Sequence, residues 1–152
     1  MPKAIVIYES MFGNTKRAAE TIIEGMKEAG VSATLSTPKE FDENQLTDFD
    51  AIIIGSPNHM GGATRGIRKF IDRLGKLKPE EKLVTVFDTY AGREYEKAVK
   101  KMENQLSEKA PGLKLISPGL SIMVEGVRGP IAEGELPKCK EFGVIIANQL
   151  KG

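Results

Sequence analysis

The stretch "KAIVIYESMFGNTKR", residues 3–17, sets the expectation for the fold. Lys3 to Tyr8 is apolar and rich in β-branched residues, which predicts a buried strand. A helical spacing of apolar residues begins at about Asn14 and continues to Ala29. The link between strand and helix, residues 9–14, is polar and contains a glycine. A strand that enters a helix through such a loop is typical of an α/β unit.

The same alternation continues along the chain. After Lys3–Tyr8, the predicted strands are Val31–Ser36, Ala51–Gly55, Leu83–Asp88 and Leu113–Val124. Further helices are predicted around residues 67–74, 95–106 and 139–150, with at most a short helix near 43–47. The dipeptide Pro118-Gly119 inside the last strand predicts an edge position or a bulge. The order predicts one domain over residues 1–152, an α/β three-layer sandwich with helices on both faces of a parallel sheet.

Composition excludes several classes of protein. Lys plus Arg is 22 and Asp plus Glu is 21, and this balance argues against a dedicated nucleic-acid binder. No stretch approaches the ~20 apolar residues of a membrane span, and the N-terminus lacks the pattern of a signal peptide. The single cysteine, Cys139, cannot form an internal disulfide, which favours a reducing compartment. We therefore expect a cytoplasmic protein without membrane or nucleic-acid partners.

The loop after the first strand predicts an anion site. Ser10, Asn14 and Thr15 offer side-chain donors, and Gly13 allows close approach of the backbone. The following helix adds free N–H groups and a partial positive charge, which together suit a phosphate. A simple helix cap by Ser10 or Asn14 is the alternative, although four polar or glycine positions in six exceed what a cap requires.

Other phosphate motifs fit poorly. The glycine spacing at Gly61 to Gly66 matches a P-loop, but Ile67 and Arg68 stand where Lys and Ser or Thr are required. No G-x-G-x-x-G opens the first helix, and "IIIGSP", residues 52–57, has no Asp for a phosphoaspartate. A monophosphate site of hydroxyls and amides, without a metal, remains.

The segment "SMFGNT", residues 10–15, resembles the phosphate loop of flavodoxins, [ST]-x-T-G-x-T, with Phe12 in place of the commoner Thr. This form is similar to the flavodoxin-like domains of flavodiiron proteins and to small flavodoxins of anaerobes. The resemblance extends through residues 55–72, 87–92 and 129–136. It implies noncovalent FMN and a five-stranded sheet of order 2-1-3-4-5, for which flavodoxin is a standard example with FMN where the order reverses.

The resemblance also implies the cofactor-binding residues. They are Ser10, Met11, Phe12, Gly13, Asn14 and Thr15 for the phosphate, and Ser56, Pro57, Asn58, His59, Met60, Gly61, Gly62, Asp88, Thr89, Tyr90, Ala91 and Gly92 for the rest of FMN. Tyr90 is the candidate for stacking on the flavin, with His59 or Met60 on the other face; a solvated side chain is the alternative for Tyr90 and His59. No metal ligand and no catalytic residue is assigned.

A further hypothesis concerns rotation of the backbone at Gly61. In flavodoxins a peptide near the flavin rotates so that its carbonyl accepts from N5–H after one-electron reduction. Rotation is easiest where glycine tolerates positive φ, so we expect the Gly61 carbonyl to play this part. A plain turn before the next helix is the alternative.

The leading functional hypothesis is an FMN-containing electron carrier, a flavodoxin, that passes single electrons between redox proteins. The first alternative is an FMN-dependent NAD(P)H:quinone or iron reductase, and the second is a cofactor-free signalling or assembly domain. We expect redox protein partners and a monomer or weak dimer. Arg65, Arg68 and Arg93 are expected near the flavin-side loops, where solvation is the simpler role and contact with an acidic partner the alternative.

Overall fold

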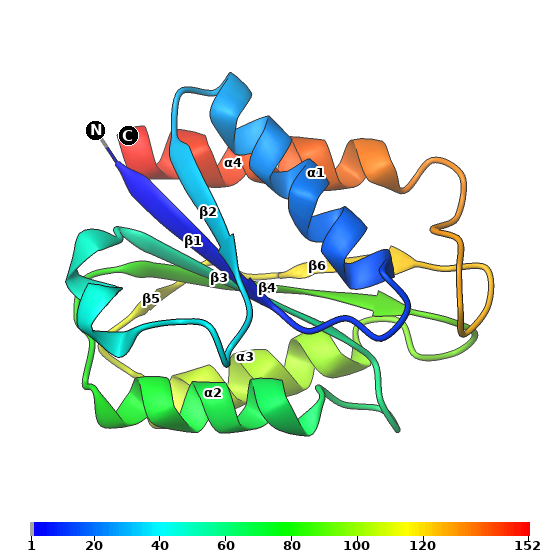
Figure 1. The fold of residues 1–152 in the computed structure, drawn as a ribbon, viewed down its shortest axis with the longest axis horizontal. Coiled ribbons are helices and arrows are strands. Elements are labelled where there is room, and N and C mark those ends of the chain that lie inside the picture. Colours follow the sequence, from blue (N-terminus) through cyan, green and yellow to red (C-terminus); the bar gives the residue numbers. More distant parts are fainter. Residues whose placement is uncertain (1) are drawn as a thin grey trace.

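The computed structural model describes residues 2–152, which form three layers (Figure 1). The strands are β1 (Lys3–Tyr8), β2 (Ser32–Ser36), β3 (Ala51–Pro57), β4 (Leu83–Tyr90), β5 (Lys114–Leu115) and β6 (Leu120–Met123). The α-helices are α1 (Asn14–Glu28), α2 (Arg65–Lys76), α3 (Lys97–Lys109) and α4 (Leu136–Lys151), and a 3₁₀ helix, η1, covers Glu43–Asp48. Helices α1 and α4 cover one face of the sheet, and α2 and α3 cover the other.

All strand pairs are parallel, and the order β2-β1-β3-β4-β5 confirms the predicted topology. The predicted fifth strand is wrong in one respect, because it is divided into β5 and β6, both paired with β4. The interruption contains Pro118, which has no N–H to give to a ladder. Gly119 follows, and its N–H donates to Glu103 Oε2 instead of a strand, at 2.8 Å.

Strand periodicity divides the core into two halves. Ile5 and Ile52 face α2 and α3, whereas the alternate residues Val6 and Ile53 face α1 and α4. The central strands are therefore apolar on both faces, which explains their continuous apolar runs in the sequence. The edge strand β2 is only partly buried.

Helices α1 and α4 approach each other closely through two glycines. A Cβ at Gly25 would overlap the carbonyl oxygen of Lys140, and a Cβ at Gly143 would overlap that of Ile22. Cys139 lies in this interface, fully buried, and burial raises the pKa of its thiol to about 12. A thiol of that kind stays protonated and packs as a small apolar side chain.

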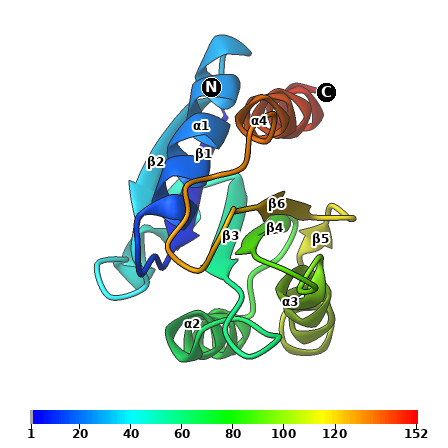
Figure 2. The same cartoon turned by 90° about the vertical axis from the view of Figure 1, so that its right-hand side faces the viewer.

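The loops that follow β1, β3, β4 and β6 gather at one end of the sheet, and Figure 2 views this end directly. Strands β3 and β4 are longer than predicted and continue to Pro57 and Tyr90, so several predicted loop residues lie in strands. Within residues 2–152, no helix combines the length and apolar character needed to cross a bilayer.

Candidate functional site

A cavity of about 210 Å³ opens at this end of the sheet, between the loops after β1, β3, β4 and β6. Its lining residues are Ser10, Met11, Phe12, Asn14, Thr15, Pro57, Asn58, Met60, Thr89, Tyr90, Ala91, Glu94, Val124 and Val127. The cavity lies beyond the carboxyl ends of the neighbouring strands β1 and β3, whose following helices, α1 and α2, cover opposite faces of the sheet. This is the position at which open α/β sheets bind ligands.

The start of α1 faces this cavity and has no side-chain cap. Gly13 occupies the cap position in a left-handed conformation, with φ of +91°. Ser10 Oγ accepts from the Gly13 N–H at 3.0 Å, which closes the loop but leaves the first helical amides without a side-chain acceptor. Thr15 is buried, and its Oγ1 lies 2.9 Å from Thr89 Oγ1 on β4. Hydroxyls and free amides therefore meet at one positive helix end, as an anion requires.

The starts of α2 and α3 are closed by protein atoms. Thr64 Oγ1 accepts from the Ile67 N–H at 3.3 Å and caps α2. The acceptors for the first amides of α3 come from the loop after β3 and from β4. Asn58 Oδ1 accepts from the Ala98 N–H at 3.0 Å, and Asp88 Oδ2 accepts from the Val99 N–H at 3.0 Å.

Asp88 is fully buried beneath α3 rather than in the wall of the cavity. Its second oxygen accepts from Ser121 Oγ at 2.6 Å. Burial raises the pKa of Asp88 to about 6, although the hydrogen bonds from Ser121 and the Val99 amide lower it. Its position identifies Asp88 as a helix cap that belongs to the fold.

Apolar side chains form the broad walls of the cavity. Tyr90 ends β4 and is 8% exposed, and its ring packs edge-on against Tyr95 with centroids 5.3 Å apart. Pro57 and Met60 contribute from the loop after β3. An open, mainly apolar cavity with a polar end suits a flat ring system that carries a phosphate.

Residues 59–62 form a two-residue hairpin turn. His59 and Gly62 exchange backbone hydrogen bonds of 2.8 and 3.2 Å, and φ is +56° at Met60 and +79° at Gly61. Positive φ at both central residues defines a type I′ turn. The peptide that carries the Gly61 carbonyl is tied down, because its N–H, on Gly62, donates to His59. The Met60–Gly61 peptide makes no backbone hydrogen bond within residues 2–152, so no backbone partner holds it in its present orientation.

Glu94 adds an acceptor without a hydrogen bond beside this turn. Its Oε2 is buried and has no hydrogen-bond partner, although Lys97 Nζ lies 3.8 Å away. A Cβ at Gly61 would lie 3.5 Å from the same oxygen. A buried acceptor of this kind is usually satisfied by a ligand or a water.

The loop between β6 and α4 closes the site on the remaining side. A Cβ at Gly129 would overlap the Asn14 side chain, and φ of +94° there also favours glycine. The Arg128 guanidinium lies over the Phe12 ring, 5.6 Å from its centroid. Glu94, Val124 and Val127 line the cavity but are absent from the residues predicted above. An apolar residue in a glycine-rich loop after a strand, such as Val127, is the signal that could have found this wall.

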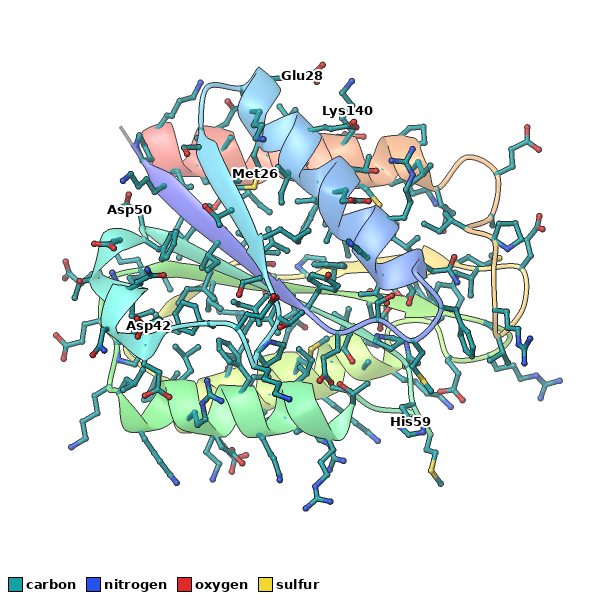
Figure 3. All side chains as sticks on the ribbon, in the orientation of Figure 1. Met26, Glu28, Asp42, Asp50, His59 and Lys140 are labelled. Carbon is teal, nitrogen blue, oxygen red and sulfur yellow. The ribbon has the colours of Figure 1, made fainter. Side chains whose placement is uncertain are left out.

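Seven predicted residues do not line the cavity: Gly13, Ser56, His59, Gly61, Gly62, Asp88 and Gly92. Gly13, Gly61 and Gly62 shape the loops that form it. Ser56 Oγ accepts from the Thr64 N–H at 3.0 Å, so it positions the start of α2. His59 projects at the loop end of the molecule, as Figure 3 shows, and lines a neighbouring groove. Within residues 2–152, no group of three or more His, Cys, Asp or Glu side chains is placed to bind a metal ion.

Comparison with known proteins identifies relatives of this chain. The family model described as "Flavodoxin domain" matches residues 5–120. A solved archaeal flavodoxin is 28% identical, with a TM-score of 0.85 over 99% of both chains. Oxidised flavodoxin 2 from Bacillus cereus is 27% identical, with a TM-score of 0.81 over 97% of this chain and 99% of its own.

A curated relative has a longer chain. "NAD(P)H dehydrogenase (quinone) 3" of Rhizobium meliloti is 29% identical over 104 residues, which are 55% of this chain and 49% of the relative. This chain therefore matches about half the length of that protein.

Proposed function

The chain belongs to the flavodoxin family, and we propose that it binds FMN and carries single electrons between redox proteins. The observation that carries this proposal is the start of α1, which has no side-chain cap and opens onto an apolar cavity. Protein atoms accept from the first amides of α2 and α3. Helix α4 also has no side-chain cap, but none of its residues lines the cavity, so α1 is the uncapped helix start that opens onto this site.

The residues present fit FMN in three respects. The hydroxyls of Ser10 and Thr15 and the free amides of α1 suit a phosphate dianion. Tyr90, Pro57 and Met60 supply flat or flexible apolar contacts for a ring. The Glu94 oxygen that has no hydrogen-bond partner supplies an acceptor for an N–H at the edge of that ring.

FMN, when bound, supplies the one-electron chemistry. The chain itself binds the phosphate at α1, fixes the ring between the loops after β3 and β4, and excludes water with the loop between β6 and α4. Tyr90 has little freedom, because it ends a central strand and packs against Tyr95. The Met60–Gly61 peptide can present either its N–H or its carbonyl toward the ring, since neither is held by another backbone group in the described chain.

A reductase that takes hydride from NAD(P)H and reduces a quinone is the second candidate. The relative named NAD(P)H dehydrogenase (quinone) favours it. The carrier is supported better by the short loop between β4 and α3, residues 91–96, which offers little surface to hold a nicotinamide over the ring. We further propose a monomer or weak dimer in the cytoplasm.

The visible spectrum of the purified protein, titrated with FMN under anaerobic conditions, tests the proposal. We expect stoichiometric binding with quenched flavin fluorescence, and only slow reduction by NADH or NADPH. Rapid bleaching by either nucleotide would favour the reductase. Failure to bind FMN would exclude both candidates.

A further inference from the structure

Exposed apolar side chains gather around the mouth of the cavity. Met60 is 94% exposed and Val127 is 78% exposed, and Met11, Phe12 and Tyr95 accompany them. Among residues 2–152, the other exposed large hydrophobic side chains are Leu77, Met123 and Ile145, and none of them lines the cavity. Tyr95 does not line it either, but its ring packs against Tyr90, which does. Apolar patches of this kind on a protein surface mark sites where another molecule binds. We call Met11, Phe12, Met60, Tyr95 and Val127 the apolar rim.

A positively charged groove adjoins this rim. It has a volume of about 530 Å³, lies between the first turns of α2 and α3, and is lined by Arg65, Arg68 and Lys101. None of these three cations forms an ion pair with any carboxylate of residues 2–152. Met60 lines both the groove and the cavity, so the groove and the apolar rim are continuous. We call Arg65, Arg68 and Lys101 the basic groove.

The opposite side of the rim has the other charge. The loop between β6 and α4 carries the exposed Glu125 and Glu133, and Arg128 is its only basic residue. Its third carboxylate, Glu135, is buried and forms an ion pair with Lys138. Charge is therefore distributed unevenly around the cavity, although the net charge of the whole chain is only +1. An uneven distribution favours one orientation of a charged partner over others.

We propose that the apolar rim and the basic groove form a docking surface for an acidic redox protein, whose carboxylates contact the groove while its apolar centre covers the rim. Protein interfaces are enriched in Met, Tyr, Phe and Arg, the residue types found here. Unpaired cations beside the rim attract such a partner over a distance and raise its rate of association. The proposal depends on the proposed electron-carrier function, because the rim surrounds the proposed FMN site.

Two acidic probes, a plant-type [2Fe–2S] ferredoxin and a rubredoxin, and one basic probe, cytochrome c, provide the test. Dissociation constants are measured by calorimetry with every protein oxidised, in the presence and absence of FMN. The rate of electron transfer from reduced ferredoxin to the FMN-loaded protein is then followed by stopped flow, in which one electron leaves the iron–sulfur cluster and reduces the flavin.

The test variant is Arg68→Glu with Lys101→Glu. The matched control, Lys76→Glu with Lys109→Glu, makes the same charge changes at the other ends of the same two helices. We expect the test variant to weaken acidic-probe binding and slow the transfer at least tenfold at low salt. In the test variant, binding of the acidic probes should depend much less on salt concentration, and cytochrome c should bind more tightly. The control variant should resemble the parent.

Three results would overturn the proposal: equal binding of acidic and basic probes by the parent, equal effects of the test and control variants, or binding of inorganic pyrophosphate in the basic groove without binding of either acidic protein. The last result would assign the groove to a small anion. Because binding is also measured without FMN, failure of the protein to bind FMN would count against its proposed function and would leave the docking measurement valid.

Discussion

Helices α1 and α3 both begin at the carboxyl ends of the strands, but only the first amides of α3 meet side-chain acceptors. At α3, Asn58 from the loop after β3 accepts from the Ala98 amide, and Asp88 from β4 accepts from the Val99 amide. At α1, Gly13 occupies the cap position and no side chain caps the helix. The fold thus satisfies the first amides of α3 internally and leaves those of α1 without a side-chain acceptor. Under the proposed function, the phosphate of FMN takes that place at α1.

Ser10→Asp would break this contrast most strongly, because it gives α1 a carboxylate of the kind that α3 already has. Two unit charges ~4 Å apart repel by roughly 4 kcal/mol at an effective dielectric constant of 20. FMN affinity should therefore fall about a thousandfold, while the free protein keeps its stability. Fluorescence titration with FMN and with riboflavin provides the measurement. An equal loss for riboflavin, which has no phosphate, would contradict the assignment of the phosphate to α1.

Asp88→Asn would test the α3 side of the comparison through pH. Since burial raises the pKa of Asp88 to about 6 in the folded protein, from about 3.8, the native state retains a proton that the unfolded chain releases. Stability should therefore fall as pH rises from about 4 to 6, by up to about 3 kcal/mol, and stay low above that range.

Urea denaturation of parent and Asp88→Asn between pH 4 and 7 checks this expectation. The substitution should remove most of this dependence of stability on pH, because an amide does not titrate between pH 4 and 7. The amide oxygen can still accept from the Val99 N–H, so FMN affinity at fixed pH should change little. An unaltered slope would mean that another group titrates in this range.

Gly61→Ala would test the two peptides of the hairpin turn against each other. The Gly61–Gly62 peptide donates a hydrogen bond to His59, whereas the Met60–Gly61 peptide has no backbone partner in the described chain. Gly61 already has φ of +79°, so an added Cβ penalises the present conformation by about 1–2 kcal/mol. Rotation of the free Met60–Gly61 peptide converts a type I′ turn into type II′, which moves Gly61 to negative φ.

Alanine at position 61 should therefore raise the potential of the first one-electron step, by about 59 mV for each 1.4 kcal/mol. This sign is opposite to the one expected if the Gly61 carbonyl itself rotated into a positive-φ state. Spectroelectrochemical titration beside Gly62→Ala makes the measurement. An unchanged potential would mean that this peptide does not rotate.

Thr64→Ala is the smallest change and serves as the control for α1. It removes the cap of α2, which typically costs about 1 kcal/mol of stability. Because Thr64 does not line the cavity, the ratio of FMN to riboflavin affinity should stay at the parent value. Thermal denaturation and the same two titrations measure both effects, and a selective loss of FMN would mean that α2 also contributes to the phosphate site.

Sequence periodicity predicted much of the fold because helices and strands bury faces with different spacings. The apolar run at Ala51–Ile54 predicted a central strand, and both of its faces are indeed covered. The division of the last strand into β5 and β6 was only partly foreseen. Pro118 indicated an irregularity, but the division requires β4, with which both pieces pair.

The sequence by itself determined the α/β order and the family, because strand periodicity and the segment "SMFGNT" are local properties of the chain. It left a cap by Ser10 or Asn14 as an alternative for the start of α1, and the structure shows no side-chain cap there. Tertiary structure decided which polar residues face the cavity. Asp88 and Thr89 are adjacent in sequence, yet Asp88 lies beneath α3 and Thr89 faces Thr15 across the site. Successive side chains of a strand point to opposite faces, so only the packing of α1 and α3 assigns one of them to the fold and the other to the site.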